Sequence, residues 1–138
     1  MYVIDVALQA KLVADTGTGG VETLATGGIH KIVAPQGTAA PFLTWQNVSS
    51  VPEYSFGRLV RVTCQYLLKS YADGLDWDAP QAVIERALAI LFDASWSVSG
   101  FDVRSRGGNR FDTQEDVDAK SVVVSVGYVT IEAMPTGS

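Results

Sequence analysis

The fold of this chain is decided by residues 59–68, which read LVRVTCQYLL. Apolar side chains occupy every second position from Val60 to Leu68, and the first three positions between them carry Arg61, Thr63 and Gln65. This alternation predicts a β-strand with one face in the core, because successive side chains of a strand point to opposite faces of a sheet. The second face of the strand is expected to meet solvent or another protein.

Weaker patterns on both sides of this segment predict further strands. They combine β-branched or aromatic residues with flanking Gly and Pro. A turn is expected at Pro35-Gln36-Gly37 and another at Gly107-Gly108. The four additional strands are predicted at residues 29–33, 42–48, 96–103 and 121–131.

Two helices are predicted from apolar residues at helical spacing. The first covers residues 3–14, with a buried stripe formed by Ile4, Leu8 and Leu12. The second begins at Asp78, which Gln81 follows three residues later as in a capping box, with Pro80 in the first turn. Its stripe is formed by Ile84, Leu88 and Leu91. Residues 87–92 carry no charge, so we expect this helix to be covered on most sides.

These elements predict an α+β fold: an antiparallel β-sheet with two α-helices packed on one face. The length of 138 residues favours a single domain, residues 1–138. Residues 16–28 hold five Gly and four Thr, which predicts a flexible loop. Residues 134–138 are expected to form a loose C-terminal tail.

The composition favours a subunit of a larger assembly. Hydrophobic residues make up 47% of the chain and charged residues only 18%, against roughly 25% in an average soluble protein. Some apolar surface should therefore remain outside the core of the monomer. The formal charge of −5 argues against a dedicated nucleic-acid binder, which needs a basic surface. The sequence also predicts neither a membrane span nor a signal peptide, and so a cytoplasmic site of synthesis.

No catalytic, cofactor or metal site is expected. His30 is the only histidine, and no neighbouring nucleophile or carboxylate pattern accompanies it. Cys64 falls on the apolar face of its strand, where a thiol acts as a small hydrophobe. The acidic residues Asp73, Asp76 and Asp78 resemble a calcium loop only loosely, and helix capping explains them better.

One charged segment is a candidate for contacts between subunits. Three arginines around Gly107-Gly108 are followed at once by four acidic residues. They could form complementary patches that join neighbouring copies head to tail in a ring, or a solvated hairpin, or a loop that touches DNA. The candidate residues are Arg104, Arg106, Arg110, Asp112, Glu115, Asp116 and Asp118.

Two segments carry a resemblance to a known family: residues 28–37, GIHKIVAPQG, and residues 41–46, PFLTWQ. The chain resembles the tail terminator, or tail completion, proteins of long-tailed bacteriophages. The later course is similar too, from RVTCQY at residues 61–66 through SYAD at residues 70–73 to a helix over residues 82–91. The resemblance extends over residues 3–132, and we expect the segment 16–28 to depart from the family pattern.

This resemblance implies a non-enzymatic structural subunit of a virion tail or neck, made in the bacterial host cytoplasm. Such subunits form a homo-oligomeric ring, commonly a hexamer, at the head-proximal end of the tail tube. The ring ends tube growth, and its partners are the tail tube protein and the head–tail connector. Genome DNA would pass through an acidic lumen without specific binding. The alternatives are another neck or minor tail component, or a small α+β ligand-binding or enzymatic domain.

Overall fold

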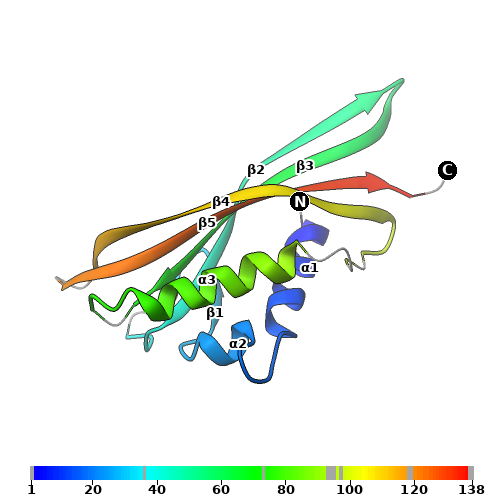
Figure 1. Cartoon of the computed structure of the whole chain (residues 1–138). Coiled ribbons are helices and arrows are strands. Elements are labelled where there is room, and N and C mark those ends of the chain that lie inside the picture. Colours follow the sequence, from blue (N-terminus) through cyan, green and yellow to red (C-terminus); the bar gives the residue numbers. More distant parts are fainter. Residues whose placement is uncertain are drawn as a thin grey trace.

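The computed structural model of the chain is a five-stranded sheet with helices beside one of its faces (Figure 1). It describes residues 2–35, 37–72, 74–92, 96, 98–117 and 120–136. The elements are α1 (Tyr2–Val13), α2 (Val21–Leu24), β1 (Ile29–Lys31), β2 (Phe42–Ser55), β3 (Arg58–Tyr71), α3 (Asp78–Leu91), β4 (Phe101–Val117) and β5 (Lys120–Pro135). Their order across the sheet is β1-β2-β3-β5-β4.

Strand β3 lies in the middle of the sheet, antiparallel to both β2 and β5. The predicted alternation is confirmed, because Val62, Cys64, Tyr66 and Leu68 are all at most 5% exposed. Val60 continues the same pattern but is 46% exposed. The reason is that β5 pairs with β3 only from Val62 to Tyr71, so β3 begins outside the covered part of the sheet.

The predicted fold class is wrong. Strands make up 51% of the structure, the sheet is mixed, and there are three short helices instead of two packed on an antiparallel sheet. Strand β1 runs parallel to β2, with Ile29 opposite Leu43 and Lys31 opposite Trp45. The link of residues 32–41 was interpreted as a hairpin connection. It is long enough to return the chain to the start of its neighbour, so β2 runs in the same direction as β1.

The turn predicted at Gly107-Gly108 is also wrong, because both glycines lie inside β4. The pairing with β5 shifts register between Ser105 and Gly108, which is a β-bulge. Gly107 has a φ of +123°, and a Cβ on Gly108 would lie 2.0 Å from the carbonyl oxygen of Tyr128. Glycine is therefore required here for the bulge and for the close approach of two strands. It does not reverse the chain.

All three helices lie on the same side of the sheet, which we call the helix face (Figure 1). The predicted stripe of α1 is confirmed, since Ile4, Leu8 and Leu12 are fully buried. In α3, Ile84 and Leu91 are buried and Leu88 is partly buried. The expected cover on most sides of residues 87–92 is confirmed, because only Ala89 and Phe92 of this segment are exposed. The sheet, α1 and α2 cover α3 and leave one side open to solvent.

The Gly- and Thr-rich segment of residues 16–28 contains the short helix α2. Val21 and Ala25 belong to the main core, with exposures of 0% and 1%. Asp15 precedes the segment and accepts a hydrogen bond of 2.9 Å from the Val21 backbone N–H. Two further bonds of 2.8 Å come from the Arg86 guanidinium of α3. These contacts tie both ends of α2 to the core, and the flexibility expected for the segment stays a prediction.

A few sequence-based expectations fall on residues outside the described part of the chain. Asp73 of the loose calcium-like pattern is one, and Asp118 of the candidate contacts is another. Of the expected C-terminal tail, residues 134 and 135 are the end of β5, and the Thr136 backbone N–H donates to the Gly100 carbonyl at 3.0 Å. Residues 137 and 138 lie outside the described residues.

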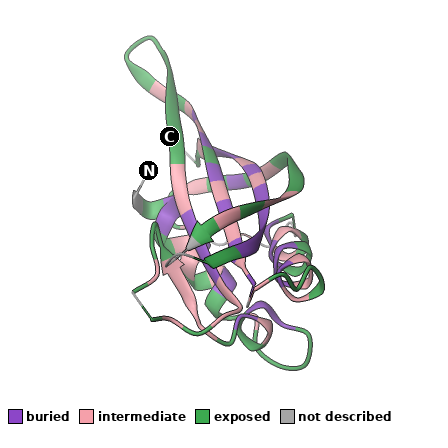
Figure 2. Ribbon diagram, turned by 90° about the vertical axis from the view of Figure 1, so that its left-hand side faces the viewer, coloured by how far each residue is buried: buried purple, intermediate pink, exposed green. Residues whose placement is uncertain are grey.

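The β2–β3 hairpin extends well beyond the rest of the sheet (Figures 1 and 2). We call its distal part, residues 48–61, the arm. Every described β2 side chain from Val48 to Ser55 is exposed, in contrast to Leu43, Thr44 and Trp45 at the start of the same strand. The long strands predicted only as residues 42–48 and 59–68 therefore continue into a projection that contributes little to the core: Leu59 packs against it, partly buried, and the other apolar side chains of the arm are exposed.

Candidate assembly surfaces

The candidate arginines and acidic residues lie on one strand, β4, but on different faces of it. Arg104 lies opposite Glu132 of β5 on the face without helices, which we call the open face. Arg106 reaches the same Glu132 across the bulge, at 3.2 Å. Arg110 lies on the helix face, 3.5 Å from Glu85 of α3. Strict alternation would place positions 104, 106 and 110 on one face, so the bulge between Ser105 and Gly108 is what moves Arg110 away from the other two arginines.

The acidic candidates also have partners within the chain. Asp112 accepts hydrogen bonds from Gln81 of α3 at 2.8 Å and from Ser125 at 2.7 Å. Glu115 pairs with Lys69 of β3 at 3.2 Å, and Asp116 accepts a bond from Ser121 at 3.0 Å. Asp118 lies outside the described residues. The structure does not gather these side chains into two opposed patches, and their predicted role between subunits stays a prediction.

Four charged side chains form a row across the open face, which we call the charge row: Glu53, Arg61, Glu132 and Arg106. Arg61 bridges Glu53 of β2 and Glu132 of β5, at 2.6 Å in both cases. Glu132 is the most buried member, with a side chain 12% exposed. The hydrogen bond from Arg61 lowers the pKa of Glu53. Sequence reasoning missed this row because its members come from four strands and carry no local pattern.

A small second core lies on the open face of the sheet. Val122, Val124 and Val126 of β5 are at most 9% exposed, although none of the helices in the described residues covers this face. Leu67, Tyr71 and Tyr128 pack against them, and burial raises the pKa of Tyr71. The run of valines in β5 is therefore buried on both sides, as in strands that form the centre of a sheet.

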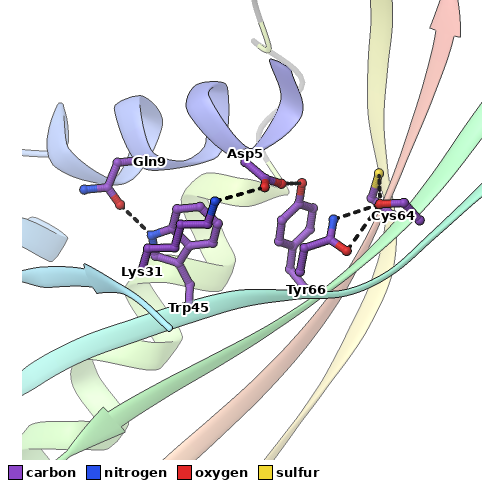
Figure 3. Close-up of polar contacts among 8 residues, drawn as sticks. Asp5, Gln9, Lys31, Trp45, Cys64 and Tyr66 are labelled. Atoms are coloured by element: carbon purple, nitrogen blue, oxygen red, sulfur yellow. Dashed lines mark hydrogen bonds and ion pairs between the residues drawn. The ribbon is translucent and has the colours of Figure 1, made fainter. Parts of the chain in front are cut away.

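Polar side chains join α1 to the sheet beneath it (Figure 3). The Tyr66 hydroxyl donates to Asp5 at 2.5 Å, and Lys31 lies 3.4 Å from the same carboxylate. The Trp45 indole N–H donates to the side-chain oxygen of Gln9 at 2.5 Å. Burial, followed by the bond to Asp5, raises the pKa of Tyr66, so its hydroxyl stays protonated and donates. These bonds hold α1 at a fixed position on β2 and β3.

A hollow of about 310 Å³ opens beside this network, between α1 and the start of β2. It is lined by Asp5, Val6, Gln9, Lys31 and Trp45. Val6 is 50% exposed, and the Lys31 ammonium lies 5.5 Å from the centre of the Trp45 ring. The hollow is accordingly a mainly apolar depression with charged groups at its edge.

The arm carries a row of uncovered apolar side chains. Val51 is 60% exposed, Tyr54 is 67% exposed, and Phe56 at the tip is fully exposed at 103%. Phe56 and Gly57 form a two-residue turn with φ values of +52° and +76°. Such turns favour Asn-Gly, and a bulky side chain at positive φ is an outlier. The arm was not predicted from the sequence, although the Phe-Gly pair between two strands could have revealed it.

His30 and Cys64 have structural surroundings. His30 Nε2 lies 2.9 Å from the Gly27 carbonyl oxygen, and the ring meets Phe42 edge-on at 6.4 Å. Cys64 is buried in the main core, with its sulfur 3.6 Å from the Ser50 hydroxyl. In the described ranges no cluster of three or more His, Cys, Asp or Glu side chains could hold a metal ion. Within the same ranges no helix is long and apolar enough to cross a membrane.

The arrangement defines a small mixed-sheet domain with a projecting hairpin. No family model and no curated protein matches the chain. It is similar in fold to a chain of the solved "Virion of native gene transfer agent (GTA) particle", with a TM-score of 0.65 and 15% identity over 96% of this chain and 99% of that chain. A second solved chain, which carries no functional name, gives a TM-score of 0.62 and 13% identity over 99% and 97%. The fold is therefore shared with a component of a phage-like particle.

Proposed function

We propose that this protein is a structural subunit of a tailed phage or phage-like particle and forms a ring at the head-proximal end of the tail tube. In that place the ring ends tube growth and joins the tail to the head connector. Its partners are further copies of the same chain, the tail tube protein and the connector. The proposed site of action is the tail or neck of the virion.

The observation that carries this proposal is the likeness to a chain of the gene transfer agent virion over nearly the full length of both chains. A match of this extent supports a common role for the whole domain. The uncovered apolar arm adds support, because exposed apolar surface of this kind marks contacts between proteins. The resemblance of residues 28–37 and 41–46 to tail terminators supports the particular place in the particle.

We also propose that the protein is not an enzyme and does not read DNA sequence. The candidate arginines on β4 support the second point, since Arg104, Arg106 and Arg110 each lie within 4.0 Å of a carboxylate of the same chain. Arginines held in this way offer less charge to phosphates than free ones. Their exposed members can still contact a neighbouring subunit at the edge of an interface.

Deletion of the gene from the particle that encodes it tests the proposal. Loss of a tail terminator should give heads without tails and free tubes of uncontrolled length, and the gene supplied in trans should restore both. Free tubes of normal length would instead favour a different neck component. Complete particles with normal tails after deletion would contradict every role in the tail or neck.

A further inference from the structure

We propose that the arm of one copy docks on α1 of the next copy, with Phe56 seated in the hollow beside Val6. This inference rests on the proposed function, because it names the contact that builds the ring. It uses two surfaces of the same chain, one that projects and one that receives. Each of them carries apolar side chains that the monomer leaves uncovered, Phe56 on the first and Val6 on the second.

The receiving surface is the outer side of α1. This helix is apolar nearly all round: Ile4, Leu8 and Leu12 face the core, whereas the opposite side also carries small apolar residues. A helix that is hydrophobic on every side is normally buried. Here one stripe is uncovered, and its members are Val3, Val6, Ala10 and Val13. Their spacing of three and four residues places them in one line along the helix.

The hollow gives this stripe a specific anchor point, because Val6 belongs to both. Its volume of about 310 Å³ is sufficient for an aromatic side chain. Trp45 also lines the hollow, but it is only 2% exposed and the Lys31 ammonium lies over its ring, so Val6 would provide most of the contact with Phe56. Aromatic side chains that fill pockets of this kind are the usual energetic centres of protein interfaces.

The projecting surface is the arm, whose tip contains a backbone conformation that is unfavourable for a bulky residue. Phe56 has a φ of +52° and is fully exposed, so its side chain adds strain to the turn and gains no contact in return. A strained backbone at an exposed position points to a use outside the monomer. Val51 and Tyr54 extend the apolar surface from the tip along β2, so the arm can follow the length of the α1 stripe.

The arm cannot reach the hollow of its own chain. Trp45 in the wall and Phe56 at the tip lie on the same hairpin, eleven positions apart in the sequence. An extended strand rises about 3.3 Å per residue, so the two points are roughly 35 Å apart. The partner must therefore be another molecule, and the second copy carries the complementary surface. A contact between two different surfaces of identical chains either closes into a ring or continues as a filament.

Pairwise cross-linking tests this geometry. One variant carries Val6→Cys and a second carries Phe56→Cys, and the two are mixed and oxidised, both as free protein and in assembled particles. A disulfide between the two variants must join different molecules, and Cys64 is buried and should not compete. We expect the mixed dimer to be the main product, with little product from either variant alone. Phe56–Phe56 dimers as the main product would overturn the head-to-tail contact.

Single substitutions provide an independent test of the same contact. Phe56→Ser and Val6→Glu should each weaken self-association by at least about tenfold, as expected for an anchor side chain and its pocket. Leu75→Ser is the matched control, because Leu75 is 59% exposed on a loop away from the arm, and it should assemble as the parent does. Unchanged melting temperatures will show that all three variants fold.

Different results would contradict the docking contact and the proposed function. If both variants assemble normally and the mixed cross-link forms neither in solution nor in particles, the docking contact is wrong even where images show a ring at the neck. If Phe56→Ser leaves the ring intact and only loses attachment to tail tubes, the arm binds the tube protein and the second copy is the wrong occupant. Normal tails after gene deletion would contradict the function whether or not the chain self-associates.

Discussion

The two long hairpins of the sheet differ in how far their side chains are buried or paired. The β4–β5 hairpin carries most of the charged residues that the sequence singles out, and it pairs them with α3, β3 and its own strands. It also contributes fully buried residues to two cores. The β2–β3 hairpin begins in the core at Leu43 and then leaves it, and its exposed residues Val51, Tyr54 and Phe56 have no cover.

This difference shows where to look for contacts with other proteins. A charge that already has a partner gains little from a second one, because exposed ion pairs contribute about 0–1 kcal/mol. An exposed apolar side chain gains the whole of its burial, about 25 cal/mol for each Å² removed from water. The β2–β3 hairpin carries none of the contact residues predicted from the sequence, yet it is the stronger candidate for contacts between subunits.

Matched valine substitutions in the two hairpins should give the largest difference in stability. Val129→Ala removes a fully buried side chain from the core, and we expect it to lower the free energy of unfolding by about 2 kcal/mol. Val51→Ala lies on the arm and should change it by less than about 0.5 kcal/mol. Urea denaturation of the monomer measures both. Equal losses would mean that the arm contributes to the fold of the monomer.

The charge row connects the two hairpins, and its buried member should matter more than an exposed pair. Glu132→Gln weakens the bonds to Arg61 and Arg106 while keeping the shape of the side chain, so we expect a loss of about 1–2 kcal/mol. Asp102→Asn is the control, because Asp102 and Arg104 are 49% and 69% exposed. It should cost less than about 0.5 kcal/mol. A cost for Asp102→Asn as large as that for Glu132→Gln would contradict this ranking.

The dependence of stability on acid pH should differ between Asp15, which lies near the core, and Glu53, which lies on the arm. The bonds from Arg86 lower the pKa of Asp15, and the bond from Arg61 lowers that of Glu53. A lowered folded-state pKa means that the stabilisation is present above the ordinary pKa values of the free side chains, 3.8 and 4.5, and is lost as the pH falls through the folded-state pKa values. Asp15→Asn should thus flatten the acid side of the stability profile.

Glu53→Gln should flatten that profile much less, since Glu53 is exposed and its pair with Arg61 is screened by solvent. Denaturation curves at pH values from about 2 to 7 will give both profiles. If Glu53→Gln changes the profile more than Asp15→Asn, then the arm is more tightly coupled to the core than its exposure indicates.

The smallest effect is expected from the exposed charges of β4. Arg104→Glu should weaken self-association less than about threefold, and only at low salt, because a charge at the rim of an interface acts mainly through long-range attraction. Phe56→Ser should act equally at low and high salt. A loss with Arg104→Glu that matches the loss with Phe56→Ser and persists in high salt would place the β4 arginines at the centre of the interface.

Local patterns predicted the parts of the fold that local chemistry determines. The alternation in β3 and the stripe of α1 were identified from side-chain spacing, because burial on one face imposes that spacing directly. The direction of β1 was not predictable in this way, since parallel and antiparallel neighbours share the same strand pattern. The turn predicted at Gly107-Gly108 was wrong for a similar reason, because glycine is common both in turns and in β-bulges. The close approach of Tyr128 on the opposite strand shows that a bulge is present, and the sequence does not reveal that contact.

The candidate surfaces were less predictable than the fold. The charge row joins Arg61 to Glu132, which lie 71 positions apart, so no window of sequence contains both. The arm was missed because Val51, Tyr54 and Val60 look like core residues until the extent of β5 is known. Exposure depends on where the neighbouring strand ends, and that is a property of the whole sheet.

The strand order has a consequence for how the chain folds. Strand β5 lies between β3 and β4, yet it begins at Lys120, long after β3 has ended at Tyr71. During synthesis the β2–β3 hairpin is complete before its partner β5, which follows α3 and β4, so the backbone edge of β3 from Val62 to Tyr71 stays unpaired on the ribosome. Closure of such a non-local pair is slow. Insertion of β5 should therefore limit the folding rate, and a nascent chain stopped before Lys120 should bind hydrophobic dyes and aggregate.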